Sequence, residues 1–244
     1  MDDLMLPKID LPVYELKLPS NGNTVRVRPF IVKEEKLLLM AVESGDANEI
    51  INTTKQVINN CLIDKDVDIN SLPFFDVDYL FIALRAKSIG EKIDTIFKCK
   101  TELEDETICN TPFDVSFDIS KCDTYKDDSI KSDIKVQSDI LVKMKYPGYS
   151  IMKYITDTQN VLDRKVKIIA ACIDRIIQKD KIYSSKDMTR EKMVEFVEGL
   201  TEAQYKMLEN YIDNFPYFYY SVNHTCTSCG FQHNMRYTDF SDFF

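Results

Sequence analysis

Histidine and glycine are scarce in this sequence, and tryptophan is missing. Two histidines leave little material for acid–base catalysis, because imidazole is the side chain whose ordinary pKa lies near neutrality. The six glycines form neither G-x-G-x-x-G nor G-x-x-x-x-G-K, so the dinucleotide-binding fingerprint and the P-loop are absent. The patterns G-x-S-x-G and H-E-x-x-H are missing too. We therefore predict that the protein is not an enzyme.

Basic charge and long apolar runs are also lacking. The net charge of -9 disfavours non-specific binding to nucleic acid and to anionic lipid. No apolar run reaches the length of a membrane-spanning helix, and Met1-Asp2-Asp3 lacks the basic start of a signal peptide. We therefore expect a cytosolic protein that binds no nucleic acid, no membrane and no small-molecule substrate.

Cysteine, by contrast, occurs seven times. An odd number of cysteines without a secretory signal favours metal binding by some of them over a disulfide framework. Cys226 and Cys229 form a C-x2-C pair, and Gly230 gives the turn that follows its conformational freedom. Two thiolates at this spacing can hold one face of a tetrahedral zinc ion. The pair therefore predicts half of a metal site.

The other half is expected far upstream, at the end of a second hairpin. Two alternatives stay open: the thiols carry no metal, or Cys226 and Cys229 form a redox C-x-x-C pair. A redox pair usually lies at a helix N-terminus, which lowers its thiol pKa, whereas both flanks here alternate like strands. The predicted metal ligands are Cys99, Cys109, Cys226 and Cys229.

Four thiolates would close the coordination sphere of the metal. A catalytic zinc keeps an open position, so we predict a structural Zn²⁺ that joins two hairpins. His224 and His233 are the predicted substitute ligands if Cys109 does not bind, because imidazole is an equally good zinc ligand.

Helical and strand periods occupy different parts of the chain. Strands are predicted at Tyr14–Leu18, Val25–Val27, Ile93–Phe97, Phe113–Ile119, Ile134–Val136, Ile140–Tyr146, Phe218–Val222 and Phe231–Tyr237. Helices are predicted at Lys33–Ser44, Asp46–Cys61, Asp76–Ser88, Val161–Lys179, Thr189–Leu200 and Thr201–Ile212. Their predicted caps are Asp46, Asp76, Thr189 and Thr201, the last in a capping box with Gln204. Cys61 and Cys172 are predicted to be buried packing residues, and Asn21-Gly22 predicts the turn between the first two strands. The polar segment Lys121–Ser132 is predicted to be a surface loop.

These periods predict an α+β fold. It comprises an N-terminal β-hairpin with helices, a central antiparallel β-sheet, C-terminal helices and a zinc-ribbon-like clasp that joins two β-hairpins. The chain is divided into residues 1–90 (hairpin plus helices), 91–148 (β-rich, with the loop of the upstream cysteines) and 149–244 (helical, ending in the C-x2-C hairpin). We expect the three segments to form one compact unit.

Aromatic residues gather near the end of the sequence. Phe240, Phe243 and Phe244 would be unusual as exposed side chains unless they dock on the fold or on another chain, so we predict that they bind a partner. The group from Phe215 to Tyr220 is either part of such a surface or a strand packed on both faces.

The order of these segments resembles the baseplate hub assembly proteins of T4-like contractile-tailed bacteriophages. The resemblance extends over most of the chain and is weakest in the middle. It rests on Leu11–Ser20, Val27–Lys36, Glu43–Asp46, Leu72–Pro73 with Phe75–Leu80, Leu84–Glu91, Leu200–Thr201 with Gln204, Phe215–Pro216, Cys226–Gly230 and Phe243–Phe244.

The resemblance implies a non-enzymatic assembly factor or chaperone for the central hub of the phage tail baseplate, acting in the host cytoplasm on hub and tail proteins. An alternative is a minor structural component of the hub in the virion. Two further alternatives are a zinc-ribbon nucleic-acid binder, which needs a basic face, and a metal-dependent enzyme, which needs an open coordination position.

Overall fold

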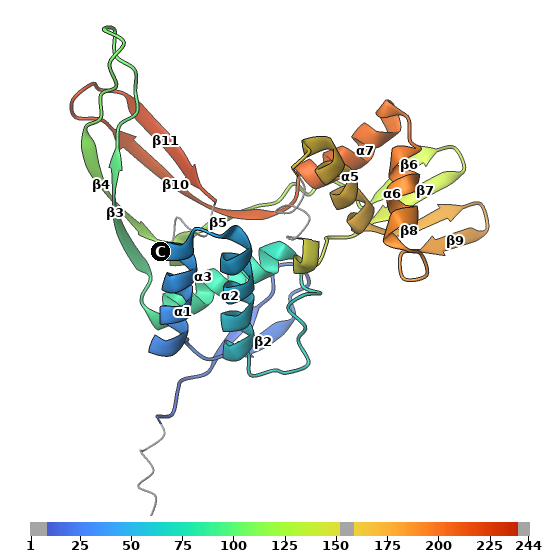
Figure 1. Ribbon diagram of the computed structural model, residues 1–244, viewed down its shortest axis with the longest axis horizontal. Helices are drawn as coiled ribbons and strands as arrows, with labels where there is room; N and C mark the ends of the chain where they lie inside the picture. The colour runs from blue at the N-terminus through green and yellow to red at the C-terminus, as the bar shows by residue number, and fades with distance from the viewer. Residues whose placement is uncertain (1–8, 152–158, 239–244) are drawn as a thin grey trace, which may run out of the picture.

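In the computed structural model, which describes residues 9–151 and 159–238, helices and antiparallel sheets occupy separate parts of the chain, and the predicted α+β class is confirmed. The elements surround three hydrophobic clusters. Figure 1 shows the corresponding parts: an N-terminal module, an arm of two long hairpins, and a C-terminal module on the other side. None of the helices within the described ranges has the length and apolar character needed to cross a membrane.

The N-terminal module consists of the predicted hairpin followed by three helices. Its elements are β1 (Tyr14–Lys17), β2 (Thr24–Val27), α1 (Val32–Ser44), α2 (Ala47–Cys61) and α3 (Phe74–Ser88). The strands pair antiparallel with Leu16 opposite Val25, so that alternate side chains face the helices. Val27, Ile58 and Leu80 form the fully buried centre of this core.

Helix α3 begins earlier than predicted. Pro73 is the N-cap, and the predicted cap, Asp76, lies inside the first turn, where it is fully buried. Its carboxylate accepts hydrogen bonds from the backbone N–H of Ser20 (2.9 Å) and from the Ser20 hydroxyl. Burial raises the pKa of Asp76, and these two hydrogen bonds oppose that rise. The cap prediction was wrong because this carboxylate joins α3 to the β1–β2 turn.

The arm consists of two antiparallel hairpins that pack face to face, as Figure 1 shows on its left side. They are formed by β3 (Lys92–Lys98) with β4 (Pro112–Asp118) and by β10 (Tyr217–Thr225) with β11 (Gln232–Tyr237). Their inward faces carry mainly aromatic and branched side chains, among them Phe117, Phe218 and Val222. Phe218 is buried and Tyr217 half-buried, so the aromatic group near Tyr217 is mainly part of a packed strand.

The segment Lys121–Ser132 is not the plain loop that we predicted. The segment begins at the last residue of the 3₁₀ turn η1 (Ile119–Lys121) and contains the short strand β5 (Asp123–Tyr125). Strand β5 pairs antiparallel with β10. The rings of Tyr125 and Tyr217 stack at a centroid distance of 5.0 Å. The three residues of β5 are too few and too polar to show the alternating pattern that predicts a strand. They form a strand because β10 supplies their hydrogen-bonding partner.

The C-terminal module is a four-stranded antiparallel sheet in the order β6-β7-β8-β9 that packs with three helices. The elements are β6 (Asp133–Gln137), β7 (Ile140–Met144), α5 (Val161–Cys172), β8 (Ile173–Gln178), β9 (Lys181–Ser184), α6 (Arg190–Glu198) and α7 (Glu202–Asp213). The predicted caps Thr189 and Thr201 are confirmed, since each accepts a hydrogen bond from a backbone N–H of the first turn.

The predicted helix Val161–Lys179 is half helix and half strand. Helix α5 ends at Cys172, and from Ile173 the backbone is extended and pairs with β7. The buried positions Ile169, Ile173 and Ile176 fit a helical period, which is why the sequence favoured one long helix. The β-branched residues suit a strand equally well, and β7 and β9 pair with both edges of β8.

The chain passes between the modules twice. Strands β6 and β7 belong to the C-terminal core, whereas β10 and β11 return to the arm, so both clusters combine residues from before and after position 148. The division into residues 1–90, 91–148 and 149–244 stays a prediction. Between β7 and α5 the chain also touches the N-terminal module: Gly148 bridges Pro73, and the N–H of Tyr149 donates to the carbonyl of Leu72 (2.7 Å).

Candidate metal centre

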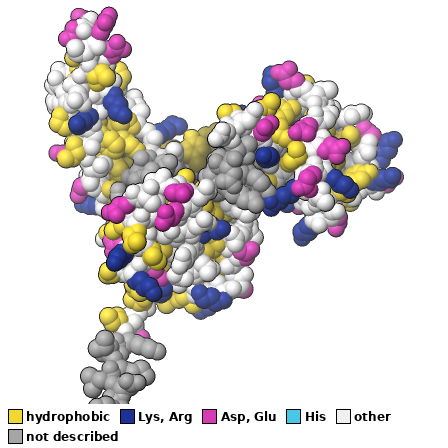
Figure 2. Space-filling model, viewed as in Figure 1, with side chains coloured by type: hydrophobic (Ala, Val, Ile, Leu, Met, Phe, Trp, Pro, Cys, Tyr) yellow, Lys and Arg dark blue, Asp and Glu magenta, His cyan; other side chains and the backbone are white. Residues whose placement is uncertain are grey.

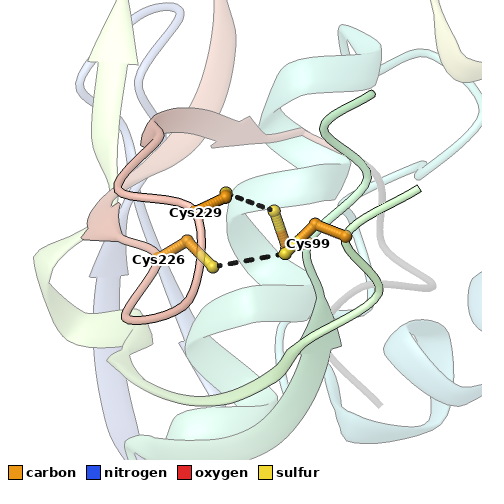
Figure 3. Close-up of side chains that lie close together, drawn as sticks. Cys99, Cys226 and Cys229 are labelled. Atoms are coloured by element: carbon orange, nitrogen blue, oxygen red, sulfur yellow. Dashed lines mark hydrogen bonds between the residues drawn. The ribbon is translucent and has the colours of Figure 1, made fainter. Parts of the chain in front are cut away.

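Four of the seven cysteines meet where the ends of the two arm hairpins lie together. Cys99 and Cys109 come from the β3–β4 connection, and Cys226 and Cys229 come from the β10–β11 connection. Figure 3 shows Cys226 and Cys229 pointing from their loop toward Cys99. The four Sγ atoms all lie within 4.8 Å of one another. The structure therefore brings together the four cysteines that the sequence predicted as ligands.

The sulfur spacing fits a tetrahedral metal ion. Two contacts between the hairpins, Cys99 to Cys229 and Cys109 to Cys226, each have an Sγ–Sγ distance of 3.7 Å. A tetrahedral ZnS4 centre with bonds of about 2.3 Å has sulfur–sulfur edges of about 3.8 Å. All four cysteines are free, and the distances are far longer than a disulfide bond. The donor set can therefore hold a metal ion with all four thiols as ligands.

A tight turn positions the downstream pair. The N–H of Cys226 donates to the carbonyl of Phe231 (2.9 Å), and the N–H of Gly230 donates to the carbonyl of Cys226 (2.9 Å). Gly230 has a φ of 72°, a left-handed conformation that glycine adopts without steric cost. The spacing of two residues and the glycine thus place both thiols on the same side of the turn.

The upstream pair lies in a wider connection that is nevertheless ordered by backbone hydrogen bonds. The N–H of Cys99 donates to Thr111, and the N–H of Cys109 donates to Thr101, both at 2.9 Å. Asn110 has a φ of 54°, which turns the chain so that Cys109 faces the site. Beyond the cysteines the connection continues to an exposed acidic tip, visible at the end of the arm in Figure 2, which contains Glu102, Glu104, Asp105 and Glu106.

The surroundings of the thiols favour thiolate at two positions and oppose it at a third. A hydrogen bond from the Thr111 hydroxyl lowers the pKa of Cys109 to about 6. The backbone N–H groups of Cys229 and Ser228 lower the pKa of Cys226. The backbone N–H of Phe231 would lower the pKa of Cys229 as well, but burial and the neighbouring thiolates outweigh it and raise that pKa to about 11.

The two histidines predicted as substitute ligands have different surroundings. His233 places its Nε2 atom 3.2 Å from the Sγ atom of Cys99. His224 instead stacks on the ring of Phe113, with centroids 3.9 Å apart and an interplanar angle of 7°. Neither belongs to the group of four mutually close donors. His233 is thus a neighbour of one of the four clustered cysteines, and His224 supports the hairpin packing.

Aromatic side chains pack together near the ends of the strands that lead into the cysteine connections. The ring of Phe97 lies 6.2 Å from that of Phe113 across the β3–β4 hairpin and 4.9 Å from that of Tyr237 on β11. Sequence reasoning missed Phe113 and Thr111 as supports of the site. Phe113 could have been found from the register of the two alternating strands, which pairs it with Phe97.

The other predicted residues lie away from this centre or outside the described part. Cys61 and Cys172 are fully buried, as predicted for packing residues, and burial raises the pKa of each thiol. Cys122 is half-buried beside the arm core. The predicted partner-binding residues Phe240, Phe243 and Phe244 lie outside the described residues.

A family model described as "T4 bacteriophage base plate protein" matches residues 11–244, nearly the whole chain. Neither the curated proteins nor the solved structures contain a significant match.

Proposed function

Because the chain belongs to the T4 bacteriophage base plate protein family, we propose that it is a non-enzymatic assembly factor for the central hub of the tail baseplate. The match over residues 11–244 is the observation that carries this proposal. As an assembly factor, the protein acts by binding hub and tail proteins in the host cytoplasm. No nucleic acid, membrane or small molecule takes part.

The metal centre supports a binding role over a catalytic one. Four thiols supply all four positions of a tetrahedral ion, so no position is left for a water or a substrate. We propose that the ion is Zn²⁺, because a set of four thiolates in a tetrahedral arrangement suits zinc. The ion holds the ends of the two arm hairpins together, and binding to partners takes place on other surfaces.

Metal analysis combined with thiol counting tests the zinc assignment. We expect one zinc per chain and, besides the buried Cys61 and Cys172, four thiols whose protection from an alkylating reagent depends on the metal. Loss of the zinc to a strong chelator should expose these four thiols together. Alkylation of all four at the rate of free thiols in zinc-containing protein would refute the assignment.

Co-migration with baseplate proteins tests the assembly role. The protein is mixed with each candidate hub or tail protein, and with pairs of them, and the mixtures are separated by size-exclusion chromatography. At least one mixture should yield a complex. Absence of a complex in every combination would count heavily against the proposal. If the protein instead formed a complex with DNA that dissociated at raised salt, a nucleic-acid binder would be favoured.

The C-terminal phenylalanines provide a narrower test of the same role. A variant that ends at Asp239 lacks Phe240, Phe243 and Phe244, and we expect it to bind the hub partner more weakly. Replacement of the same three residues by serine is the matched control, because it keeps the chain length. Unchanged binding by both variants would exclude the tail from the interface.

The family match is equally compatible with a protein that stays in the particle as a minor hub component. Quantitative mass spectrometry of purified phage particles separates the two roles. An assembly factor should be absent from particles and present in the lysate. A fixed number of copies per particle would assign the protein to the virion baseplate.

A further inference from the structure

The outward face of α1 carries more apolar surface than a solvent-exposed helix normally does. Its buried positions are Glu34, Leu38 and Ala41. On the opposite side Val32 is 80% exposed, Met40 54% and Leu39 47%. The outer face of a surface helix is usually polar, so large apolar side chains there mark a contact surface.

Five of the exposed residues of α1 form one narrow stripe. At about 100° of rotation per residue, Val32 and the positions four, seven, eight and eleven residues after it fall within roughly one quarter of the helix circumference. This stripe consists of Val32, Lys36, Leu39, Met40 and Glu43, all of which are exposed. Figure 2 shows hydrophobic side chains among basic and acidic ones over the position that α1 has in Figure 1.

The charges of the stripe are arranged symmetrically about its apolar centre. Lys36 precedes Leu39 by three residues, and Glu43 follows Met40 by three residues. A two-fold axis through the Leu39–Met40 pair would therefore place Lys36 of one helix opposite Glu43 of an antiparallel copy, and the reverse pair on the other side. Lys36 and Glu43 form no ion pair within residues 9–151 and 159–238, so both charges are available.

We propose that this stripe is the interface of a symmetric dimer, in which α1 packs antiparallel against α1 of a second copy of the chain. Leu39 and Met40 form the apolar centre, and two Lys36–Glu43 pairs flank it. One helix face buries less area than a standard protein interface, so the dimer is weak and assembles at high local concentration. The proposal does not depend on the proposed assembly role.

Charge reversal tests the proposal with sedimentation equilibrium over a range of protein concentrations. Lys36→Glu places like charges opposite one another at both flanks, as does Glu43→Lys, and each should weaken dimerisation about tenfold or more. The double variant Lys36→Glu/Glu43→Lys restores opposite charges and should dimerise like the unmodified protein. A 1:1 mixture of the two single variants should form a heterodimer about as well as the double variant forms its homodimer, since each flank then pairs a glutamate of one variant with a lysine of the other.

Apolar substitutions provide the second arm of the test. Leu39→Glu should abolish the dimer, because it brings two carboxylates to the two-fold axis. Ile182→Glu is the matched control, since Ile182 is 63% exposed on β9, and it should have no effect. Circular dichroism checks that each variant keeps its helices. A monomer at every concentration, or a double variant as weak as the single ones, would overturn the proposal, and the latter result would point to a different partner on this face.

Discussion

The Nε2 atom of His233 lies 3.2 Å from the Sγ atom of Cys99, although 134 positions separate the two residues in the sequence. With the proton on Nε2, the imidazole donates a hydrogen bond to the thiolate and reduces its excess negative charge. Groups that hydrogen-bond to metal ligands orient them and tune the affinity of the site. We therefore propose that His233 acts on a bound metal through Cys99 and not as a ligand itself.

Replacing His233 by alanine should weaken metal binding without abolishing it. We expect a loss of about 10- to 100-fold in affinity, which is typical for the partner of a ligand, measured by competition with a chromophoric chelator. His224→Ala is the control, because it removes the other imidazole and leaves the surroundings of Cys99 intact. Complete loss of metal from His233→Ala would show that His233 is a ligand.

Removal of the metal should loosen the arm and leave the rest of the protein folded. Beyond Phe97 and Phe113 the hairpin ends have little apolar support, whereas the C-terminal module has its own core. We expect chelation to increase amide hydrogen exchange in β3, β4, β10 and β11 but not in β6–β9.

The variant Cys229→Ser should reproduce this local effect in the absence of chelator, and its partner binding should fall only as far as the arm is loosened. Cys122→Ser is the matched control, since Cys122 is half-buried near the arm core and is not one of the four clustered thiols. Cys229→Ser with full exchange protection and no partner binding would mean that the cysteine pair is itself the binding site.

Local signals in the sequence predicted the parts of the fold that depend on neighbours in the chain. The Asn21-Gly22 turn, the capping pair Thr201–Gln204 and the C-x2-C turn all contain their own stabilising contacts, and the structure has each of them. The pairing of the two cysteine hairpins followed from counting ligands, since two thiols cannot complete a tetrahedral site.

The mistaken predictions concern residues whose partners come from distant parts of the chain. Ile173 and Ile176 fit a helix by their period, and only pairing with β7 makes them a strand. Asp76 has the usual character of a cap, but Ser20 of another element occupies its carboxylate. Such contacts between distant residues leave no mark in the local pattern.

Replacing Gly148 by alanine should destabilise the contact between the β7–α5 connection and the N-terminal module. A Cβ atom at this position would overlap the carbonyl oxygen of Asn70. The Tyr149–Leu72 hydrogen bond holds these two backbone segments together. Overpacking of this kind costs about 1–3 kcal/mol. Urea denaturation measures the loss, with Ser150→Ala as the neighbouring control. Unchanged stability would mean that the loop of Asn70 yields easily.

Arg28 and Glu34 form an ion pair at 2.7 Å in which the glutamate side chain is only 6% exposed. Arg28→Met leaves this carboxylate buried without its partner, so we expect a loss of about 3 kcal/mol in the free energy of unfolding at pH 7. Arg26→Met is the matched control from the adjacent strand, because Arg26 is 55% exposed in its pair with Asp64 and should contribute far less. Equal losses in the two variants would show that burial of Glu34 has no energetic weight.

The deficit of Arg28→Met should shrink in acid. Burial tends to raise the pKa of Glu34, but hydrogen bonds from Arg28 and from the Ile31 N–H outweigh it, so the pKa is lowered in the intact protein. The pair therefore stabilises the fold above the pKa of an unfolded glutamate, about 4.3, and this contribution is lost only as the pH falls through the lower folded value. In the variant burial dominates, the pKa of Glu34 is raised, and protonation restores stability as the pH falls from 7 toward about 4.3. The difference in unfolding free energy between the intact protein and Arg28→Met should thus be smaller at pH 5 than at pH 7. An equal difference at both pH values would show that Glu34 stays ionised without Arg28.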